Sequence, residues 1–516
     1  MDPAMAVEMM ALRHQDAMNS VIDRADSPIQ QFYRNSTILV TGGLGFLGKQ
    51  LIEKIFRSCK IKKMFLLIRP KKGKTIQERL EKALRDPVFE GLHIKQPGFD
   101  KKLVGVEGDV AVDGLGLNQT EILKEFHVLG HFQVEMIFHL AATVRFDEPI
   151  RASVLINVRG TMELIRMAQE CAKLRSMVHV STAYAHSNEG NSGKDLFEKF
   201  YPCPMLPDDI IKLVETVEED NLIKDWPNTY TFTKAIAEEI VRAAADDLPI
   251  CVVRPPIVAS SYCEPMPGWL DLSCVFGTSG VMVGVSVGAL HVIYLEEVDR
   301  KLAIVPVDIV NNAIIAAGWS STQKPINKHE AVVYNVANTE VGISWSNFVS
   351  PKAIWYCYLI ETKNRLIYRI LSWLLHYIPA YMLDGVCVVM RRRPNGIKSF
   401  VKLYAKIEKM TNLFHYFYKH EFRFHDENVR AMINKMAPAD RHIYNCDLQS
   451  LDFHEYVKIW SIGIKKYILK DGLKNSAEGR KRQRVFRAFN YLFGFIYLYI
   501  VWFILCVLWK VIGYVF

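Results

Sequence analysis

A glycine-rich stretch near the N-terminus constrains the fold of this chain more than any other feature. Residues 37–41 read Thr-Ile-Leu-Val-Thr, and glycines follow at positions 42, 45 and 48. An apolar pattern with helical spacing begins directly afterwards, at Leu51, Ile52 and Ile55. Strand, tight turn and helix in this order are typical of a dinucleotide-binding unit, in which glycines let the backbone approach a pyrophosphate at the helix N-terminus. The alternative is a plain strand–helix turn, because glycine spacing alone is a weak signal.

The loop after the second predicted strand indicates which dinucleotide binds. Residues 64–68 form an apolar run, and Arg69-Pro-Lys-Lys72 follows it. NAD sites usually carry an acidic residue here for the ribose 2′-hydroxyl, whereas basic groups pair with a 2′-phosphate. We therefore predict NADPH, with a merely solvated basic loop as the alternative. The expected cofactor contacts in this first part of the chain are Thr41, Gly42, Gly45, Phe46, Leu47, Gly48 and Arg69.

Further apolar runs at 103–107, 136–139, 177–180 and 250–253 alternate with segments of helical spacing at 78–89 and about 157–172. This alternation predicts an α/β fold, a Rossmann-type doubly wound parallel sheet. Residues just past the strand ends should then lie at the cofactor edge. Asp109 is placed to bind the adenine or to cap the following turn, Ala141 is small enough for the cofactor to pass closely, and Pro256 turns the chain beside the nicotinamide.

The chemistry is expected at Asn228-Thr-Tyr-Thr-Phe-Thr-Lys234, which opens a predicted helix. Tyr230 and Lys234 are four residues apart and so share one helix face. An ammonium beside a phenol favours the phenolate, so we predict a lowered Tyr230 pKa and a tyrosine that exchanges protons at neutral pH. Ser181 and Thr182, just past the strand at 177–180, place hydroxyls at the same edge of the sheet. A lone Tyr-x-x-x-Lys is often only a partly buried Tyr with a snorkelling Lys, but here it accompanies the glycine-rich turn.

Length and composition divide the rest of the chain. At 516 residues it should hold two or three units. We expect an N-terminal extension (1–34), the dinucleotide-binding and catalytic domain (35–350), a smaller, mostly helical C-terminal domain (351–475) and a terminal segment (476–516). The glycine- and valine-rich stretch 276–290 is read as a loop beside the substrate. The apolar stretch 373–383, broken by Pro379, is a helix against a membrane or over a substrate channel, or else the core of the helical domain.

The terminal segment is the predicted membrane anchor. Residues 491–509 are continuously apolar and aromatic, which at about 1.5 Å per residue crosses most of a roughly 30 Å hydrocarbon core. Five basic residues precede it, so it should form a single-pass transmembrane helix with the catalytic domain in the cytosol; a buried or membrane-lying helix is the alternative. The basic flank and the lack of a terminal Ser-Lys-Leu favour the endoplasmic reticulum over the peroxisome. The basic residues are Arg480, Lys481, Arg482, Arg484 and Arg487.

The net charge and the cysteine spacing indicate which ligands and metals the chain is expected to bind. The net charge of +9 suits an anionic cofactor, a CoA-type substrate or an acidic membrane surface. The sequence carries no nucleic-acid-binding motif, so we predict no such partner. The ten cysteines are scattered without a metal-ligand pattern, which predicts a reduced environment and no bound metal. Nothing in the sequence indicates an oligomeric state.

Several motifs in unbroken order resemble one family, the alcohol-forming fatty acyl-CoA reductases of the extended short-chain dehydrogenase/reductase superfamily. The resemblance covers roughly residues 35 to 470. The matching stretches are Val40–Lys49, Leu67–Pro70, Gly108-Asp109 with Gly114–Leu117, Phe138–Phe146, Val180–Tyr184, Asn228–Lys234, Arg254–Val258 and Val305–Val310.

This resemblance implies NADPH-dependent reduction of a fatty acyl-CoA to a primary alcohol through an aldehyde. Tyr230 would protonate the carbonyl oxygen, Thr182 (or else Ser181) would bond the same oxygen, and Lys234 would hold the nicotinamide ribose. The substrate is then a fatty acyl-CoA, and membrane lipid is the expected partner. The rival readings are a membrane-bound sterol dehydrogenase or sugar epimerase with the same Tyr and Lys, and a non-catalytic dinucleotide-sensing scaffold.

Overall fold

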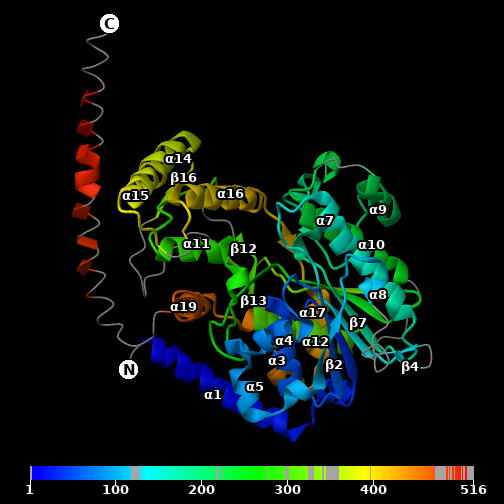
Figure 1. Ribbon diagram of the computed structural model, residues 1–516. Helices are drawn as coiled ribbons and strands as arrows, with labels where there is room; N and C mark the ends of the chain where they lie inside the picture. Colours follow the sequence, from blue (N-terminus) through cyan, green and yellow to red (C-terminus); the bar gives the residue numbers. More distant parts are fainter. Residues whose placement is uncertain are drawn as a thin grey trace.

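A computed structural model describes most of the chain (Figure 1). The residues described are 3–117, 127–128, 131–216, 220–223, 225–275, 277–296, 301–323, 331–339, 342–344, 359–394, 397–470, and 481, 484–485, 487–488, 491–492, 494–500, 502–503 and 506–507.

The central sheet has seven strands, and every neighbouring pair is parallel. The strand order reverses between β1 and β6, because β2 and β3 lie on one side of β1 and the later strands on the other. Ligands of such sheets bind at the carboxyl ends of the strands beside this switch point. The predicted doubly wound sheet is confirmed. Its strands, in spatial order, are β14 (Val332–Asn335), β9 (Ile250–Arg254), β7 (Ser176–Val180), β6 (Met136–His139), β1 (Thr37–Thr41), β2 (Lys63–Ile68) and β3 (Leu103–Glu107).

Helices cover both faces of the sheet, because alternate residues of the strands point to opposite sides. Phe138 and Val178 join the apolar core beneath α3 (Phe46–Ser58) and α12 (Val307–Ser320). Their neighbours Ile137 and Met177 join a second core beneath α8 (Gly160–Gln169) and α10 (Thr229–Ala244). The glycine-rich turn thus connects β1 to a helix on one face, whereas Tyr230 and Lys234 come from a helix on the other.

The N-terminal two-thirds of the chain also holds helices, helical turns and short strands outside this sheet. They are α1 (Pro3–Arg24), α2 (Pro28–Tyr33), α4 (Ile76–Leu84), η1 (Pro87–Phe89), α5 (Glu90–Lys95), η2 (Phe99–Lys102), η3 (Asp113–Gly116), β4 (His127–Val128), β5 (His131–Phe132), α7 (Ile150–Val154), η4 (Leu155–Arg159), η5 (Ala183–His186), η6 (Glu189–Asn191), β8 (Asp195–Leu196), α9 (Pro207–Thr216), η7 (Asp220–Ile223), β10 (Ile257–Ala259), η8 (Leu272–Cys274), α11 (Gly277–Ser286), β11 (Val292–Tyr294), β12 (Lys301–Leu302), β13 (Ile304–Pro306) and β15 (Ile343–Ser344).

Two sequence expectations in this region are wrong. The helix expected over 78–89 ends at Leu84, because Asp86 caps the separate turn that begins at Pro87. The expected loop at 276–290 is largely the helix α11, whose first residue Gly277 packs against Phe414 and has the positive φ of +56°. Gly277 lets the start of this helix approach Phe414, whereas the sequence analysis interpreted the glycines as a loop.

The C-terminal part is helical, as predicted. Its apolar stretch is not broken at Pro379: the helix continues from Arg365 to Val389, because the π-helical turn η9 leaves room for the proline in the first turn of α15. These 25 residues are long and apolar enough to cross a membrane. The elements are β16 (Ile360–Thr362), α14 (Arg365–Ser372), η9 (Trp373–Tyr377), α15 (Ile378–Val389), α16 (Phe400–Lys419), β17 (Arg423–Phe424), α17 (Glu427–Lys435), α18 (Pro438–Ile443), η10 (Leu448–Ser450), α19 (Phe453–Gly463) and η11 (Ile464–Ile468).

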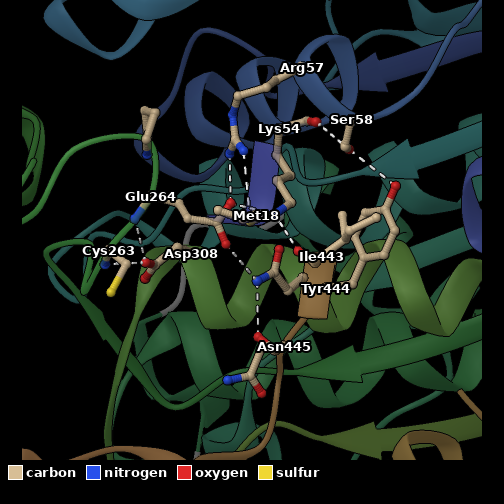
Figure 2. Close-up of polar contacts among 12 residues, drawn as sticks. Met18, Lys54, Arg57, Ser58, Cys263, Glu264, Asp308, Ile443, Tyr444 and Asn445 are labelled. Carbon is tan, nitrogen blue, oxygen red and sulfur yellow. Dashed lines mark hydrogen bonds and ion pairs between the residues drawn. The ribbon is translucent and has the colours of Figure 1, made fainter. Parts of the chain in front are cut away.

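A buried ion cluster attaches the C-terminal part to α3 (Figure 2). The Lys54 amine binds the Glu264 carboxylate and donates to the Ile443 carbonyl at 2.6 Å. Arg57 contacts the same carboxylate at 2.6 Å and pairs with Glu53 at 2.7 Å. Two cations and two anions therefore balance in the interior, as buried charges require.

Residues of the predicted terminal anchor are described only in part. The described residues 494–500 are helical. Their exposed apolar side chains include Phe495, Ile496 and Leu498. Tyr497 donates a hydrogen bond from its hydroxyl to the Leu374 carbonyl at 2.5 Å, so this helix touches η9.

Candidate active site

The glycine-rich turn is a cradle that side chains would fill. Gly42 has a φ of +74°, and a Cβ placed on it would lie 2.7 Å from the Ala141 nitrogen. A Cβ on Gly48 would lie 2.5 Å from the Gly42 carbonyl oxygen. Gly45 is the N-cap of α3 and supplies no capping side chain, so the first N–H groups of the helix remain available to an anion. This cradle fits the pyrophosphate of a dinucleotide.

Hydrogen bonds fix the switch point beside the turn. The Thr41 hydroxyl accepts from the Ala141 N–H at 3.2 Å and bonds His139 Nδ1 at 2.7 Å. Burial lowers the His139 pKa to about 3, so this imidazole stays neutral and acts as a fixed polar bridge. Thr41 and Ala141, two of the expected cofactor contacts, therefore lie together where β1 meets β6.

Phe46 and Leu47 open α3, and protein contacts hold both. The Phe46 ring stacks on Trp269 with 5.1 Å between centroids. The Leu47 carbonyl accepts from Asn311 on α12 at 2.9 Å. These contacts fix the first turn of α3, which carries the N–H groups that face the cradle.

Arg69 is exposed just past β2, which is compatible both with a 2′-phosphate contact and with the solvated basic loop. A second guanidinium, which the sequence analysis missed, stands beside it. Arg79 on α4 donates to the Arg69 carbonyl. Burial, and then the positive charge of Arg69, lower the Arg79 pKa.

Asp109 lies just past β3. It accepts from the Ala111 N–H at 3.0 Å and so caps its turn. An adenine contact of Asp109 stays a prediction.

Tyr230 and Thr182 meet at the carboxyl edge of the sheet. Asn228 caps α10 by accepting from the Thr231 N–H at 2.9 Å, which starts the helix at Thr229. Burial raises the Tyr230 pKa to about 12, and a hydrogen bond with the Thr182 side chain opposes this shift. The chain past Pro256 runs nearby, since Ala183 donates to the Pro255 carbonyl at 2.9 Å. The Tyr230 phenol is therefore neutral at physiological pH.

The predicted lowering of the Tyr230 pKa by Lys234 is wrong in this structure. Lys234 lies on the same helix, but its amine donates to the Val180 carbonyl at 2.7 Å, and it is not among the causes of the Tyr230 shift. Burial instead disfavours the phenolate. Burial also lowers the Lys234 pKa itself, to about 8, against an opposing effect of the Glu238 carboxylate.

A buried polar network behind Lys234 was not foreseen. Glu238, one turn further along α10, pairs with Arg254 at 2.6 Å and with His186 at 2.9 Å, and it accepts from Ser181 at 2.5 Å. These partners hold the Glu238 pKa below its ordinary value despite burial. The spacing Tyr230, Lys234, Glu238 at i, i+4 and i+8 was the available signal, because it places all three on one helix face.

An aromatic wall, formed by Phe146, Phe414, Phe417 and Tyr184, stands against the catalytic candidate. Phe146 stacks on Tyr230 with 6.1 Å between centroids, and Phe414 and Phe417 of α16 lie 5.0 and 5.6 Å from Phe146. Tyr184 contacts Phe417 at 5.0 Å. The C-terminal part of the chain therefore contributes Phe414 and Phe417 to an aromatic wall that reaches Tyr230 through Phe146.

The fold and the site together define a nicotinamide-dependent oxidoreductase of the Rossmann type. The cradle fits a dinucleotide, and the buried tyrosine Tyr230 stands with Thr182 at the same edge of the sheet. Among the described residues, no group of three or more His, Cys, Asp or Glu side chains could hold a metal.

The chain belongs to the fatty acyl-CoA reductase family. Two family models, both described as male sterility protein, match residues 40–314 and 375–471. The chain is 35% identical to fatty acyl-CoA reductase wat of Drosophila melanogaster over 488 residues, which covers 90% of each chain. It is 33% identical to human fatty acyl-CoA reductase 1 over 496 residues, 92% of each chain.

Solved structures share the fold. The terminal R domain from the myxalamid PKS-NRPS biosynthetic pathway aligns with a TM-score of 0.55 and 18% identity, covering 84% of this chain and 91% of that one. The reductase domain of a non-ribosomal peptide synthetase from Mycobacterium tuberculosis aligns with a TM-score of 0.53 and 19% identity, covering 86% and 97%.

Proposed function

We propose that this protein reduces long-chain fatty acyl-CoA to a primary fatty alcohol and free CoA, with NADPH as the reductant and an aldehyde as the intermediate. The observation that carries the proposal is the pairing of Tyr230 with Thr182 beneath an aromatic wall, at the edge where the glycine cradle lies. A neutral donor pair suits a carbonyl oxygen that becomes negative, and the wall suits an acyl chain.

The side chains act on the substrate oxygen. Tyr230 and Thr182 donate to the thioester carbonyl oxygen, and Tyr230 gives it a proton as carbon gains hydride. The resulting thiohemiacetal loses CoA as its thiol and becomes an aldehyde, which the same two hydroxyls then bind and protonate to the alcohol. NADPH supplies one hydride to each of the two reductions. Lys234, held at the Val180 carbonyl, is placed to bind the nicotinamide ribose.

The preference for the phosphorylated cofactor rests on charge. Arg69 is exposed past β2, and Arg79 stands at its carbonyl, so two guanidinium groups are available to one 2′-phosphate. Thr41, Ala141 and the glycines at 42, 45 and 48 serve the rest of the dinucleotide. Asp109 at the adenine and Pro256 at the nicotinamide complete the proposed contacts.

We also propose the domain division 1–34, 35–350, 351–475 and 476–516, with residues 491–509 as a single-pass anchor. The support is the long apolar run after a basic flank, and exposed apolar side chains on its described helical residues. The catalytic part then lies in the cytosol, at the endoplasmic reticulum rather than the peroxisome.

The experiment is NADPH oxidation by the detergent-solubilised full chain with a panel of acyl-CoAs, with products identified by gas chromatography. We expect alcohol at two NADPH per molecule. Tyr230→Phe should reduce alcohol formation at least 1,000-fold while NADPH binding is retained, since losing the proton donor removes a contribution of about 10²–10⁴, together with the oxyanion bond of the same hydroxyl.

Other results would redirect the assignment. Turnover of a sterol or a nucleotide sugar, but of no acyl-CoA, would move the protein to the dehydrogenases or epimerases with the same Tyr and Lys. Cofactor binding without turnover of any substrate would favour a dinucleotide-sensing scaffold. Full activity of Tyr230→Phe would remove this residue from the mechanism.

A further inference from the structure

The helix pair α14 and α15, with the π-turn η9 between them, exposes an apolar ridge. Figure 1 shows these helices at the edge of the molecule, away from the sheet and on the side of the C-terminal helix. Among their described residues only Ser372, His376 and Ala380 are buried. The exposed large apolar side chains of the ridge are Leu366, Ile367, Ile370, Trp373, Tyr381, Met382, Leu383, Val386, Val388, Val389 and Met390.

Positive charge is concentrated around this ridge. Ten Lys and Arg residues but only two acidic residues lie between positions 363 and 409, in a chain whose net charge is +9. Arg365 and Arg369 are exposed on α14, and Arg391 and Arg392 are exposed directly after the ridge. An apolar face bordered by cations matches the boundary between acyl chains and anionic headgroups.

One side of the ridge helices is occupied by protein. The Tyr377 hydroxyl binds Glu408 of α16, and Asp384 accepts from Ser399 at 2.7 Å and from Arg393 at 2.9 Å. A helix held in this way cannot be surrounded by lipid, although its length would allow a span. It can lie in the membrane surface with its free face down.

The ridge is also continuous with the proposed anchor. Tyr497, inside the terminal apolar run, hydrogen-bonds the Leu374 carbonyl of η9. Two apolar segments more than a hundred residues apart in sequence therefore meet on one side of the molecule.

We propose that α14, η9 and α15 form a second membrane-contact surface, which lies flat on an anionic phospholipid bilayer beside the terminal anchor. The ridge packs on α16, and α16 carries Phe414 and Phe417, which contact Phe146 beside Tyr230. One helix therefore connects the proposed membrane-contact surface to the aromatic wall. This proposal does not rest on the reductase activity.

The test places the photoreactive residue p-benzoylphenylalanine at Val388 in the full chain, reconstituted into vesicles of phosphatidylcholine with a minority of phosphatidylserine. Val388 is 66% exposed on the ridge, and the matched control Ile94, 81% exposed, lies on α5 away from it. We expect phospholipid adducts at position 388 at least tenfold above those at position 94. Exchanging phosphatidylserine for phosphatidylcholine should lower the yield at 388 severalfold.

Two outcomes would overturn the proposal. Equal lipid adducts at the two positions, in chains that sediment with the vesicles and bind NADPH, would show that the ridge does not contact the bilayer. Cross-linking of position 388 to a second chain would instead make the ridge an interface between copies. Because the adducts are scored without turnover, neither outcome depends on whether acyl-CoA is reduced.

Discussion

Lys234 acts as a cation only while its amine keeps a proton, and burial brings its pKa down to about 8. The protonated form predominates below that pH and is lost above it. We therefore predict that kcat/KM for an acyl-CoA falls as the pH rises through about 8, because the ribose loses its charged donor. This fall forms the alkaline limb of the pH profile. The Tyr230 pKa of about 12 is too high to cause it.

Glu238 should set the position of that limb. Its carboxylate opposes the lowering of the Lys234 pKa, so Glu238→Gln should move the alkaline limb to lower pH. The matched control is Glu239→Gln, which removes a carboxylate paired with Arg242 on the outside of the same helix and should leave the limb in place. A parallel loss of activity at all pH values in Glu238→Gln would indicate a purely structural role.

The cofactor preference belongs to single residues as well. Arg69→Asp places a carboxylate where a 2′-phosphate is expected, so the KM for NADPH should rise by at least tenfold while the KM for NADH changes little. Steady-state kinetics with both cofactors measures this difference. An equal rise in the two KM values would contradict the proposed phosphate contact.

At the scale of the element, α16 connects the C-terminal helices to the reacting group. Phe414→Ala removes a ring that lies against Phe146 and α11, and a lost apolar contact of this size weakens binding by about 1–3 kcal/mol. We predict about a tenfold lower kcat/KM with long-chain acyl-CoA and a smaller loss with short chains. Phe400→Ala, at the distant start of the same helix, is the control. Similar losses at every chain length would argue against an acyl-chain contact.

The sequence predicts whole elements of the sheet well, because buried parallel strands are short apolar runs with turns between them. It also predicts the glycine cradle, since a φ of +74° and contacts under 3 Å leave few alternatives to glycine at position 42. The end of α4 and the helix α11 are harder to predict, because the Asp86 cap and the contact of Gly277 with Phe414 exist only in the folded chain. The contacts of Glu238 and Lys234 are between distant segments, which periodicity does not locate.

At the scale of the whole molecule, the ion cluster around Lys54 makes the free energy of unfolding depend on pH in the acidic range. Neighbouring cations lower the Glu264 pKa to about 2 in the folded state, below its ordinary value of 4.5. A lowered carboxylate pKa stabilises the fold above the unfolded-state value, and this stabilisation is lost as the pH falls from about 4.5 towards 2. We predict that the free energy of unfolding drops across this range.

Glu264→Gln isolates that contribution. At pH 7 it leaves Lys54 and Arg57 short of a buried anion, which should cost about 3–5 kcal/mol. Urea unfolding at a series of pH values measures the free energy of unfolding of both proteins. The difference between wild type and variant, called the gap, should narrow below pH 4.5. Glu107→Gln, at an exposed position on β3, is the control and should show no gap. A gap independent of pH would assign the loss to packing.

The same cluster has a consequence for synthesis on the ribosome. The Lys54 amine and its acceptor, the Ile443 carbonyl, are separated by 389 residues. At roughly 5–20 residues per second, about 20–80 s pass between the translation of one and the other. During that interval the inner face of α3 carries a lysine without its carbonyl partner and apolar side chains without the 443–445 segment. The growing chain therefore keeps this lysine and its apolar neighbours incompletely covered until the segment around Ile443 has been made.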